Sequence, residues 1–223
     1  MLANLFRKRK TVRHEPDKIW RTSPLKFEGM LACSESLDRA TTRTLIITQF
    51  ADTFRSLNEL LRSKAMAFET YPTAFEGSRL RELSEYQQAG RILVAPAQAL
   101  PENFPSAQEQ TARCDFEISL LVAEHHPLPG FDDRILEFAK SLPCSSRVGF
   151  HDSLEGALIR HFGGDQIAQL MATLKMPDSE FISNPIIDRS IRRAQEKIAR
   201  RVSSPMTTDS AEEWFQLCLP DGN

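Results

Sequence analysis

Short apolar runs, separated by stretches with helical spacing, restrict this chain to one class of fold. The runs lie at 43–48 (RTLIIT), 91–95 (RILVA) and 115–123 (DFEISLLVA), and they are rich in β-branched and aliphatic residues. Runs of this kind are typical of strands that are buried on both faces. Apolar residues at helical spacing follow at 51–64, and another helix is expected at 132–141. Strands that alternate with helices predict a mainly parallel sheet covered by helices on both faces.

Weaker patterns predict four further elements. Strands are expected at 67–71 and at 147–150, the second of them at an edge of the sheet. Helices are expected at 77–89 and at 154–162. Polar residues that can accept hydrogen bonds from the free amides of a first helical turn are expected to act as caps: Asp132, Asp133, and Asp152 or Ser153.

The segment 162–201 predicts two more helices. Asp165 is expected to cap the first of them. The apolar face of this helix is expected to consist of Ile167, Leu170, Met171 and Leu174. Asn184 is expected to cap the second helix, with Pro185 at its first helical position. The buried side of the second helix is expected to carry Ile187, Ile191, Ala194 and Ile198, and basic residues cover the rest of it.

The composition is that of a soluble globular protein. The chain has 223 residues, a formal net charge of -2 and 41% hydrophobic residues, so one domain with tails is expected. No apolar run is long enough to cross a bilayer, and the N-terminus lacks the pattern of a signal peptide. The cysteines are far apart and form no C-x-x-C pair, which predicts no metal site and favours a cytoplasmic location: Cys33, Cys114, Cys144 and Cys218.

Two terminal segments, 1–14 and 203–223, are expected to be flexible. The first segment is basic, and its alternative role is peripheral contact with anionic lipid at the inner face of the membrane, or with an acidic partner, through Arg7, Lys8, Arg9 and Lys10. The second segment ends in the acidic and aromatic sequence AEEWFQL. Its alternative role is that of a docking peptide anchored by Trp214, Phe215 and Leu217.

The most specific pattern is FGGD-x-IA-x-LM-x-x-L-x-MP followed by NP-I-I-x-R-SI-x-x-AQ-x-K. In order and spacing it resembles the end of the second nucleotide-binding domain of SecA, the motor ATPase of protein export. The resemblance extends over about 17–201. It implies a RecA-like three-layer domain at 15–183, similar to the C-terminal domain of helicases. It also implies a helix at 184–202 that corresponds to the start of the family's scaffold helix.

The resemblance places part of a nucleotide edge directly after the run at 91–95. In the family this position carries a glycine-rich loop with an arginine and an aspartate. Here the sequence reads PAQALPENFP, which includes Pro96, Pro101 and Phe104. The chain also contains no G-x-x-x-x-G-K-[ST] loop, the pattern that cradles phosphates in such motors. No nucleotide is therefore expected to bind.

The second part of the family's nucleotide edge is an arginine-rich helix, which corresponds to 134–142. Leu136, Phe138 and Ser141 occupy the arginine positions here, and Arg134 lies nearby but out of register. One arginine of this kind is worth about three to five decades of rate in phosphoryl transfer. The chain is therefore expected to have kept the fold and lost the chemistry, as a pseudo-ATPase with no catalytic residues.

These losses favour a non-catalytic binding domain that acts on a SecA or on another component of protein translocation. No cofactor is expected in this interpretation. The residues expected to contact a partner are those of the amphipathic helix and of the aromatic C-terminal end: Ile187, Ile191, Arg192, Ala194, Ile198, Trp214 and Phe215.

Three alternatives remain open at this point. The chain could be half of a split motor, completed by a P-loop domain on another chain and binding ATP or ADP. It could bind nucleic acid, as helicase domains do, although its near-neutral charge does not favour this. The sequence Glu124-His125-His126 resembles an E-R-H of the family, and a metal or acid–base role there is the third alternative.

Overall fold

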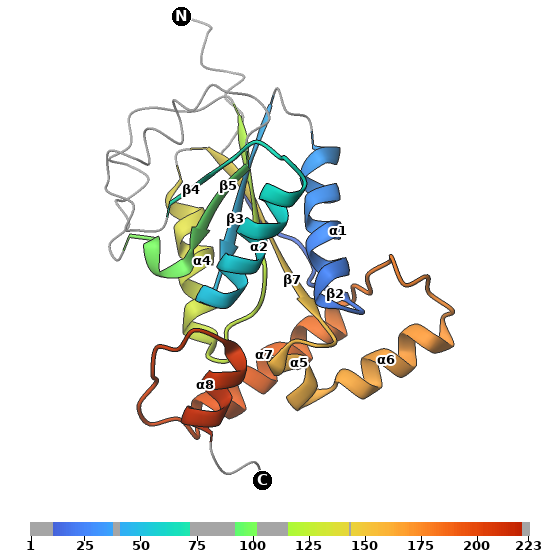
Figure 1. The fold of residues 1–223 in the computed structure, drawn as a ribbon. Coiled ribbons are helices and arrows are strands. Elements are labelled where there is room, and N and C mark those ends of the chain that lie inside the picture. Colours follow the sequence, from blue (N-terminus) through green and yellow to red (C-terminus); the bar gives the residue numbers. More distant parts are fainter. Residues whose placement is uncertain (1–10, 38–40, 72–91, 102–115, 143, 220–223) are drawn as a thin grey trace, which may run out of the picture.

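A parallel sheet forms the centre of the molecule (Figure 1). The computed structural model describes residues 11–37, 41–71, 92–101, 116–142 and 144–219. Its strands are β1 (Val12–His14), β2 (Lys18–Trp20), β3 (Thr42–Thr48), β4 (Phe68–Thr70), β5 (Ile92–Pro96), β6 (Glu117–Val122) and β7 (Ser145–Ser153). The strand order is β4-β5-β3-β6-β7, and β1 and β2 both pair with the outer side of β7. All these pairs are parallel, which confirms the predicted sheet.

Helices cover both faces of the sheet and gather at one end of it. They are α1 (Ser23–Ser36), α2 (Ala51–Ser63), α4 (Pro129–Ser141), α5 (Ala157–Phe162), α6 (Gly164–Thr173), α7 (Pro185–Ala199) and α8 (Ala211–Cys218). Figure 1 shows α5 to α8 at the carboxyl ends of the strands. Among the described helices, none is long and apolar enough to span a membrane. The helix expected at 77–89 lies outside the described residues.

The buried runs supply both faces of the sheet with core residues. On β3, Leu45 and Ile47 belong to the core cluster that includes α4, whereas Ile46 belongs to the cluster formed with α1 and α2. Successive side chains of a strand point to opposite faces, so an uninterrupted apolar run requires cover on both. The three-layer arrangement predicted from these runs is therefore confirmed.

The prediction that the last strand is an edge strand was wrong. On its outer side β7 pairs with β1, where Val12 is opposite Ser146, and then with β2, where Ile19 is opposite Asp152. Part of the segment expected to be a flexible tail, Val12–His14, thus forms β1. The backbone groups of β7 need partners on both sides when the strand is buried, and the N-terminal segment supplies them. Residues 1–10, with their basic cluster, lie outside the described part.

The prediction of a flexible C-terminal segment was also wrong over Ala211–Cys218. These residues form α8, which begins where the side chain of Ser210 accepts a hydrogen bond from the Glu213 amide at 3.1 Å. Trp214 and Phe215 are buried, at 0% and 4% exposure, in the cluster shared with α5 and α7. The two aromatic residues do anchor this segment, and the surface that holds them belongs to the same chain.

Several helices begin elsewhere than their polar residues predict. Helix α4 begins at Pro129, so Asp132 and Asp133 lie inside it and do not cap it. Asp152 and Ser153 belong to β7, and α5 begins later, at Ala157. These polar residues are therefore free to make long-range contacts.

Helix α6 begins two residues earlier than expected. Its cap is Gly163, at a φ of 155°, and Asp165 lies in its first turn. A left-handed φ of this kind favours glycine, which explains Gly163 at this junction. The next junction was predicted correctly, because the side chain of Asn184 accepts a hydrogen bond from the amide of Ile186 at 2.8 Å and Pro185 begins α7.

Candidate functional site

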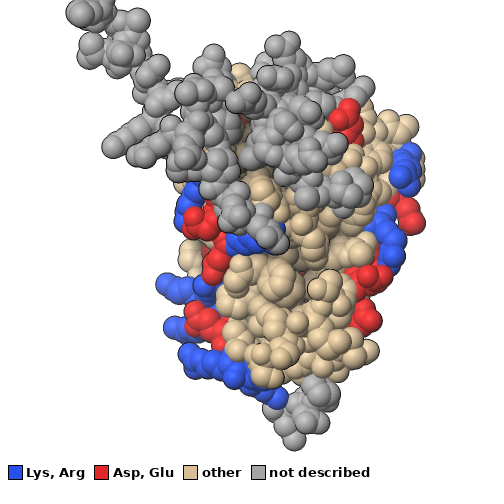
Figure 2. Space-filling model, turned by 90° about the vertical axis from the view of Figure 1, so that its left-hand side faces the viewer, with Lys and Arg blue, Asp and Glu red and all other residues tan. Residues whose placement is uncertain are grey.

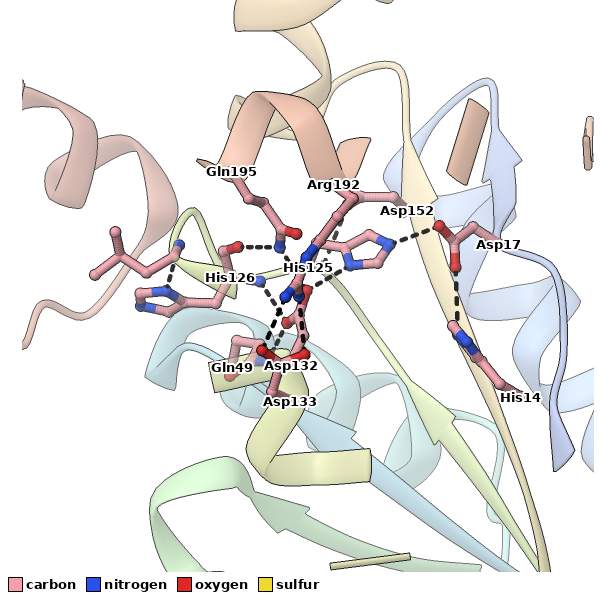
Figure 3. Close-up of polar contacts among 11 residues, drawn as sticks. His14, Asp17, Gln49, His125, His126, Asp132, Asp133, Asp152, Arg192 and Gln195 are labelled. Atoms are coloured by element: carbon pink, nitrogen blue, oxygen red, sulfur yellow. Dashed lines mark hydrogen bonds and ion pairs between the residues drawn. The ribbon is translucent and has the colours of Figure 1, made fainter. Parts of the chain in front are cut away.

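Polar side chains gather at the carboxyl ends of three neighbouring strands (Figure 3). Gln49 follows β3, the residues Glu124, His125 and His126 follow β6, and Asp152 lies near the end of β7. Gln49, the two histidines and Asp152 are buried. Open parallel sheets bind their ligands at this edge, so it is the candidate site of the chain.

His125 lies between two buried carboxylates. Its Nδ1 donates to Oδ2 of Asp132 at 2.7 Å, and its Nε2 lies 3.2 Å from Oδ2 of Asp17. Burial opposes a charge on this ring, but the two carboxylates outweigh that effect and raise the pKa of His125 well above its ordinary value. The two carboxylates therefore favour the charged form of this buried histidine, and each of its ring nitrogens faces a carboxylate oxygen.

Asp132 joins the elements that surround it. Its carboxylate accepts from Nε2 of Gln49 at 2.9 Å, from the amide of His126 at 3.1 Å and from Nε2 of Gln195, in addition to His125. Gln195 also donates to the carbonyl of His126 at 2.8 Å. Figure 3 shows these groups converging on Asp132 from the segment after β3, from the segment after β6 and from α7. A carboxylate with this many donors acts as a structural junction, because it has little capacity left to bind a ligand.

Glu124 fixes the beginning of α2. One carboxylate oxygen accepts from the amides of Gln49 and Phe50, both at 3.1 Å, and the other accepts from the hydroxyl of Thr53 at 2.7 Å. The Phe50 amide is one of the free donors that every helix start exposes, and the Gln49 amide directly precedes it. Burial raises the pKa of Glu124, and the nearby ammonium of Lys26 opposes this shift.

A polar cavity of about 190 Å³ lies next to this cluster. Its lining includes Lys26, Thr53, Glu124 and Asp152, and the first residues of α8 close one side of it. Burial raises the pKa of Asp152 as well, against the charge of Lys26. Lys26 is itself buried, and its ammonium compensates the charge of the neighbouring carboxylates.

His126 is a neutral histidine inside an aromatic stack. Its ring lies 3.8 Å from that of Phe131 and 5.3 Å from that of Phe50, and it meets the edge of Trp214 at 5.6 Å. Burial lowers the pKa of His126 to about 4, although Asp132 acts in the opposite direction. Its Nδ1 accepts from the amide of Leu128 at 3.0 Å, which a charged ring could not do.

This lowered pKa makes stability depend on pH. A histidine whose pKa is depressed in the folded state stabilises it above the unfolded pKa of about 6.5, and this contribution is lost as the pH falls toward 4. The loss expected from His126 is about 3 kcal/mol over that window. His126→Phe preserves the stack and is expected to remove this part of the pH dependence, as measured by urea unfolding at pH 4.5 and 7. His161→Phe, at an exposed position, is the control, and equal pH dependence in both variants would contradict the assignment.

The described part of the cluster does not have the composition of a metal site. Within the described ranges, no group of three or more His, Cys, Asp or Glu side chains could hold a metal ion. The ring of His125 is fully engaged, and that of His126 is occupied by the Leu128 amide and by stacking. The metal or acid–base role considered for Glu124-His125-His126 therefore gains no support from the geometry.

Apolar packing occupies the positions where the resemblance places a nucleotide edge. Phe138 is fully buried in the core beneath the sheet, and Leu136 packs against the same cluster. The guanidinium of Arg134 donates to the carbonyl of Leu100, in the turn after β5. Pro96 ends β5, while Phe104 lies outside the described residues. The Arg134 side chain is thus hydrogen-bonded to the segment that replaces the family's glycine-rich loop.

The residues expected to contact a partner lie mostly inside the molecule. Those that are buried in the cluster of α5, α7 and α8 are Ile187, Ile191, Ala194, Ile198, Trp214 and Phe215. The guanidinium of Arg192 forms two hydrogen bonds with Asp133, at 2.8 and 3.0 Å. The apolar face of α7 is therefore covered by its own chain, mainly by α5 and α4, and α8 belongs to the same apolar cluster.

Sequence reasoning missed the central part of the cluster. Asp17, Gln49 and Gln195 come from three distant segments, and no local pattern connects them. Gln195 did carry a signal, since it directly follows Ala194 on the buried side of α7 and is itself buried. A buried glutamine requires partners for its amide, so a polar junction could have been expected there.

Comparison with known proteins shows that the chain is similar to the protein translocase subunit SecA. No protein-family model matches it. The protein translocase subunit SecA of Nitratidesulfovibrio vulgaris is 26% identical over 185 residues, which are 82% of this chain and 22% of that protein. SecA of Nitrosomonas eutropha is 46% identical over 59 residues, which are 26% of this chain and 6% of that protein.

Solved structures of helicase and ATPase domains are also similar, at low identity. Domain 2 of the DEAD-box helicase Mss116p, bound to an RNA duplex, is 12% identical, and the match covers 96% of this chain and 78% of that chain at a TM-score of 0.41. The C-terminal part of the Fun30 ATPase domain is 11% identical, and the match covers 77% of this chain and 54% of that chain at a TM-score of 0.42.

The chain spans about a fifth of the length of the curated relatives it matches, 22% for the SecA of N. vulgaris. The resemblance drawn from the FGGD and NP-I-I patterns is confirmed. Over most of its length, this chain is similar to one segment of the protein translocase subunit SecA.

Proposed function

We propose that this chain is a SecA-related domain that acts by binding another protein in a process related to protein translocation, and that it neither binds nor hydrolyses ATP. One observation carries the proposal. Trp214 of α8 is fully buried at the carboxyl edge of the sheet, against the ring of His126. The chain's own side chain thus occupies part of the edge where open parallel sheets bind ligands, and the first residues of α8 close one side of the polar cavity beside it.

The packing of α4 supports the same proposal. Leu136 and Phe138 stand where the resemblance implies arginines, and Phe138 is fully buried in the core. An apolar side chain cannot stabilise charge on a phosphoryl group. Arg134 is held by the carbonyl of Leu100, which keeps this guanidinium within the fold.

The first test is calorimetric titration of the full chain with Mg-ATP and with ADP, together with a thermal unfolding scan. We expect no saturable heat and no shift of the midpoint. A ligand present at a hundredfold excess over its dissociation constant would stabilise the folded chain by about 2.7 kcal/mol, which is readily detected. Saturable binding that Arg134→Ala abolishes and Lys140→Ala preserves would overturn the proposal and favour half of a split motor.

The second test addresses the translocation partner. We expect the purified chain to associate with a full-length SecA, as measured by sedimentation velocity of the mixture. A mixture that sediments as two independent species at micromolar concentration would remove SecA as the partner. The nucleotide titration would then still decide whether the domain is a non-catalytic one.

A further inference from the structure

Helices α5, α6 and α7 enclose an apolar groove of about 180 Å³. Its floor includes Ile159 and Ile191, which are buried. Its rim consists of large apolar side chains that remain exposed, Phe162 and Leu170 at 40% each and Ile186 at 62%. Isolated exposed apolar residues are ordinary on a protein surface, but a contiguous set around a concave site marks a binding surface.

Helix α6 leaves much of its apolar face without a partner in the described chain. Of the four residues expected to form that face, Met171 is fully buried, whereas Leu170 lies on the groove and Leu174 is 59% exposed. Figure 1 shows α6 extending away from the sheet at the end of the molecule. An amphipathic helix is held in place by burial of its apolar face, so half of this one is available to another molecule.

Basic side chains border the groove along α7. Arg189, Arg193 and Lys197 follow one another at intervals of four residues, so they form a stripe along α7. This stripe adjoins Ile186 and Ser190, which line the groove. All three basic residues are exposed and form no ion pair within the described part of the chain. Figure 2 shows Lys and Arg side chains gathered along one side of the end that α7 and α8 form.

We propose that this groove binds an amphipathic helix of a partner protein, whose apolar side chains fill the groove and whose acidic side chains face the stripe of Arg189, Arg193 and Lys197. The inference rests on the proposed function, since it names the surface and the partner chemistry of that binding role. Helix-in-groove recognition requires an apolar anchor row and a charged flank, and this site offers the complement of both.

The shape of the site selects a helix over a lipid surface. Ile159 and Ile191 lie at the bottom of a concave site between three helices and are reached only by inserted side chains. A planar membrane surface meets exposed basic and apolar side chains but does not fill a groove. The basic stripe borders the groove on the α7 side, so the charge also fixes the orientation of the bound helix.

The experiment uses two synthetic peptides of about 20 residues, long enough to form a helix in isolation. Both carry leucine at the same helically spaced positions, with glutamate in one and lysine in the other at the flanking positions. Binding to the full chain is measured by fluorescence anisotropy at low salt, and backbone amide shifts locate the peptide. We expect the acidic peptide to bind at least about tenfold more tightly than the basic one, with shifts confined to α5, α6 and α7.

Paired variants distinguish specific binding in the groove from non-specific binding elsewhere on the surface. Arg193→Glu is expected to weaken binding of the acidic peptide by about three- to tenfold. Arg62→Glu, at an exposed position on α2, is expected to weaken this binding by less than about twofold. Leu170→Asp is expected to weaken binding of the acidic peptide by about tenfold or more. Leu217→Asp, at 49% exposure on α8, is expected to leave this binding unchanged.

Three outcomes would overturn the inference. These are equal binding of the two peptides, no binding of either, and binding only to vesicles that contain phosphatidylserine, which would assign the surface to a membrane. Each differs from failure of the proposed function. Saturable binding of Mg-ATP would defeat the non-catalytic role and leave the groove unaffected, whereas a negative peptide experiment with no nucleotide binding would defeat the groove alone.

Discussion

Replacing Asp132 with alanine is expected to lower the free energy of unfolding by about 3–5 kcal/mol. The carboxylate accepts from the side chains of His125, Gln49 and Gln195 and from the amide of His126. Its removal leaves buried donors without an acceptor and leaves the cationic ring of His125 with a single carboxylate partner. Urea unfolding at pH 7, followed by far-UV circular dichroism, measures the loss.

Asp133→Ala is the matched control for this prediction, because the two residues are adjacent on α4. Asp133 pairs with Arg192 at the surface, where the two side chains are 49% and 45% exposed. A surface ion pair of this kind contributes at most about 1 kcal/mol. If the two variants lost equal stability, the cluster around Asp132 would not be the junction that its contacts indicate.

Replacing Trp214 with alanine is expected to cost about 3–5 kcal/mol as well, through a different mechanism. The indole is fully buried between the rings of His126 and Phe215, and its removal leaves a cavity at the edge of the sheet. Because α8 is short, it is also expected to detach and to expose the segment before it. The measurements are urea unfolding and the rate of limited proteolysis within 203–210.

Leu217→Ala is the control for Trp214→Ala. Leu217 lies on the same helix but is 49% exposed, so its truncation removes little buried area. We expect a change below about 0.5 kcal/mol and a proteolysis rate close to that of the unmodified chain. Rapid cleavage of the unmodified chain within 203–210, at the rate seen for Trp214→Ala, would show that α8 is detached in both and would contradict its role in covering the edge.

The sheet and the order of its helices could be predicted because their signals are local. Each buried run is a contiguous stretch of β-branched and aliphatic residues, as in Leu45, Ile46 and Ile47, and burial on both faces follows from the run itself. The start of α7 was also predicted correctly, since Asn184 and Pro185 act on the residues directly beside them. Local chemistry is sufficient for such features.

The candidate site could not be predicted, because its residues come together only in the fold. Asp132 has the residue type and position of a helix cap, yet α4 begins three residues before it. Its true partners lie just after β6, on α7 and between β3 and α2. The docking of α8 was hidden for the same reason, since an acidic and aromatic end is equally compatible with a free segment and with a folded one.

The pairing of β1 and β2 with β7 has a consequence for how the chain is made. Beside β1, the amide of Thr11 donates a hydrogen bond to the hydroxyl of Ser145, which lies 134 positions away in the sequence. The N-terminal strands therefore leave the ribosome long before their partner and remain unpaired until the intervening segment and β7 have been translated. Contacts of such high contact order form late and slowly. Until they do, the outer side of β7 is an open strand edge that a neighbouring nascent chain can occupy, and a chain that starts after β2 keeps that edge permanently.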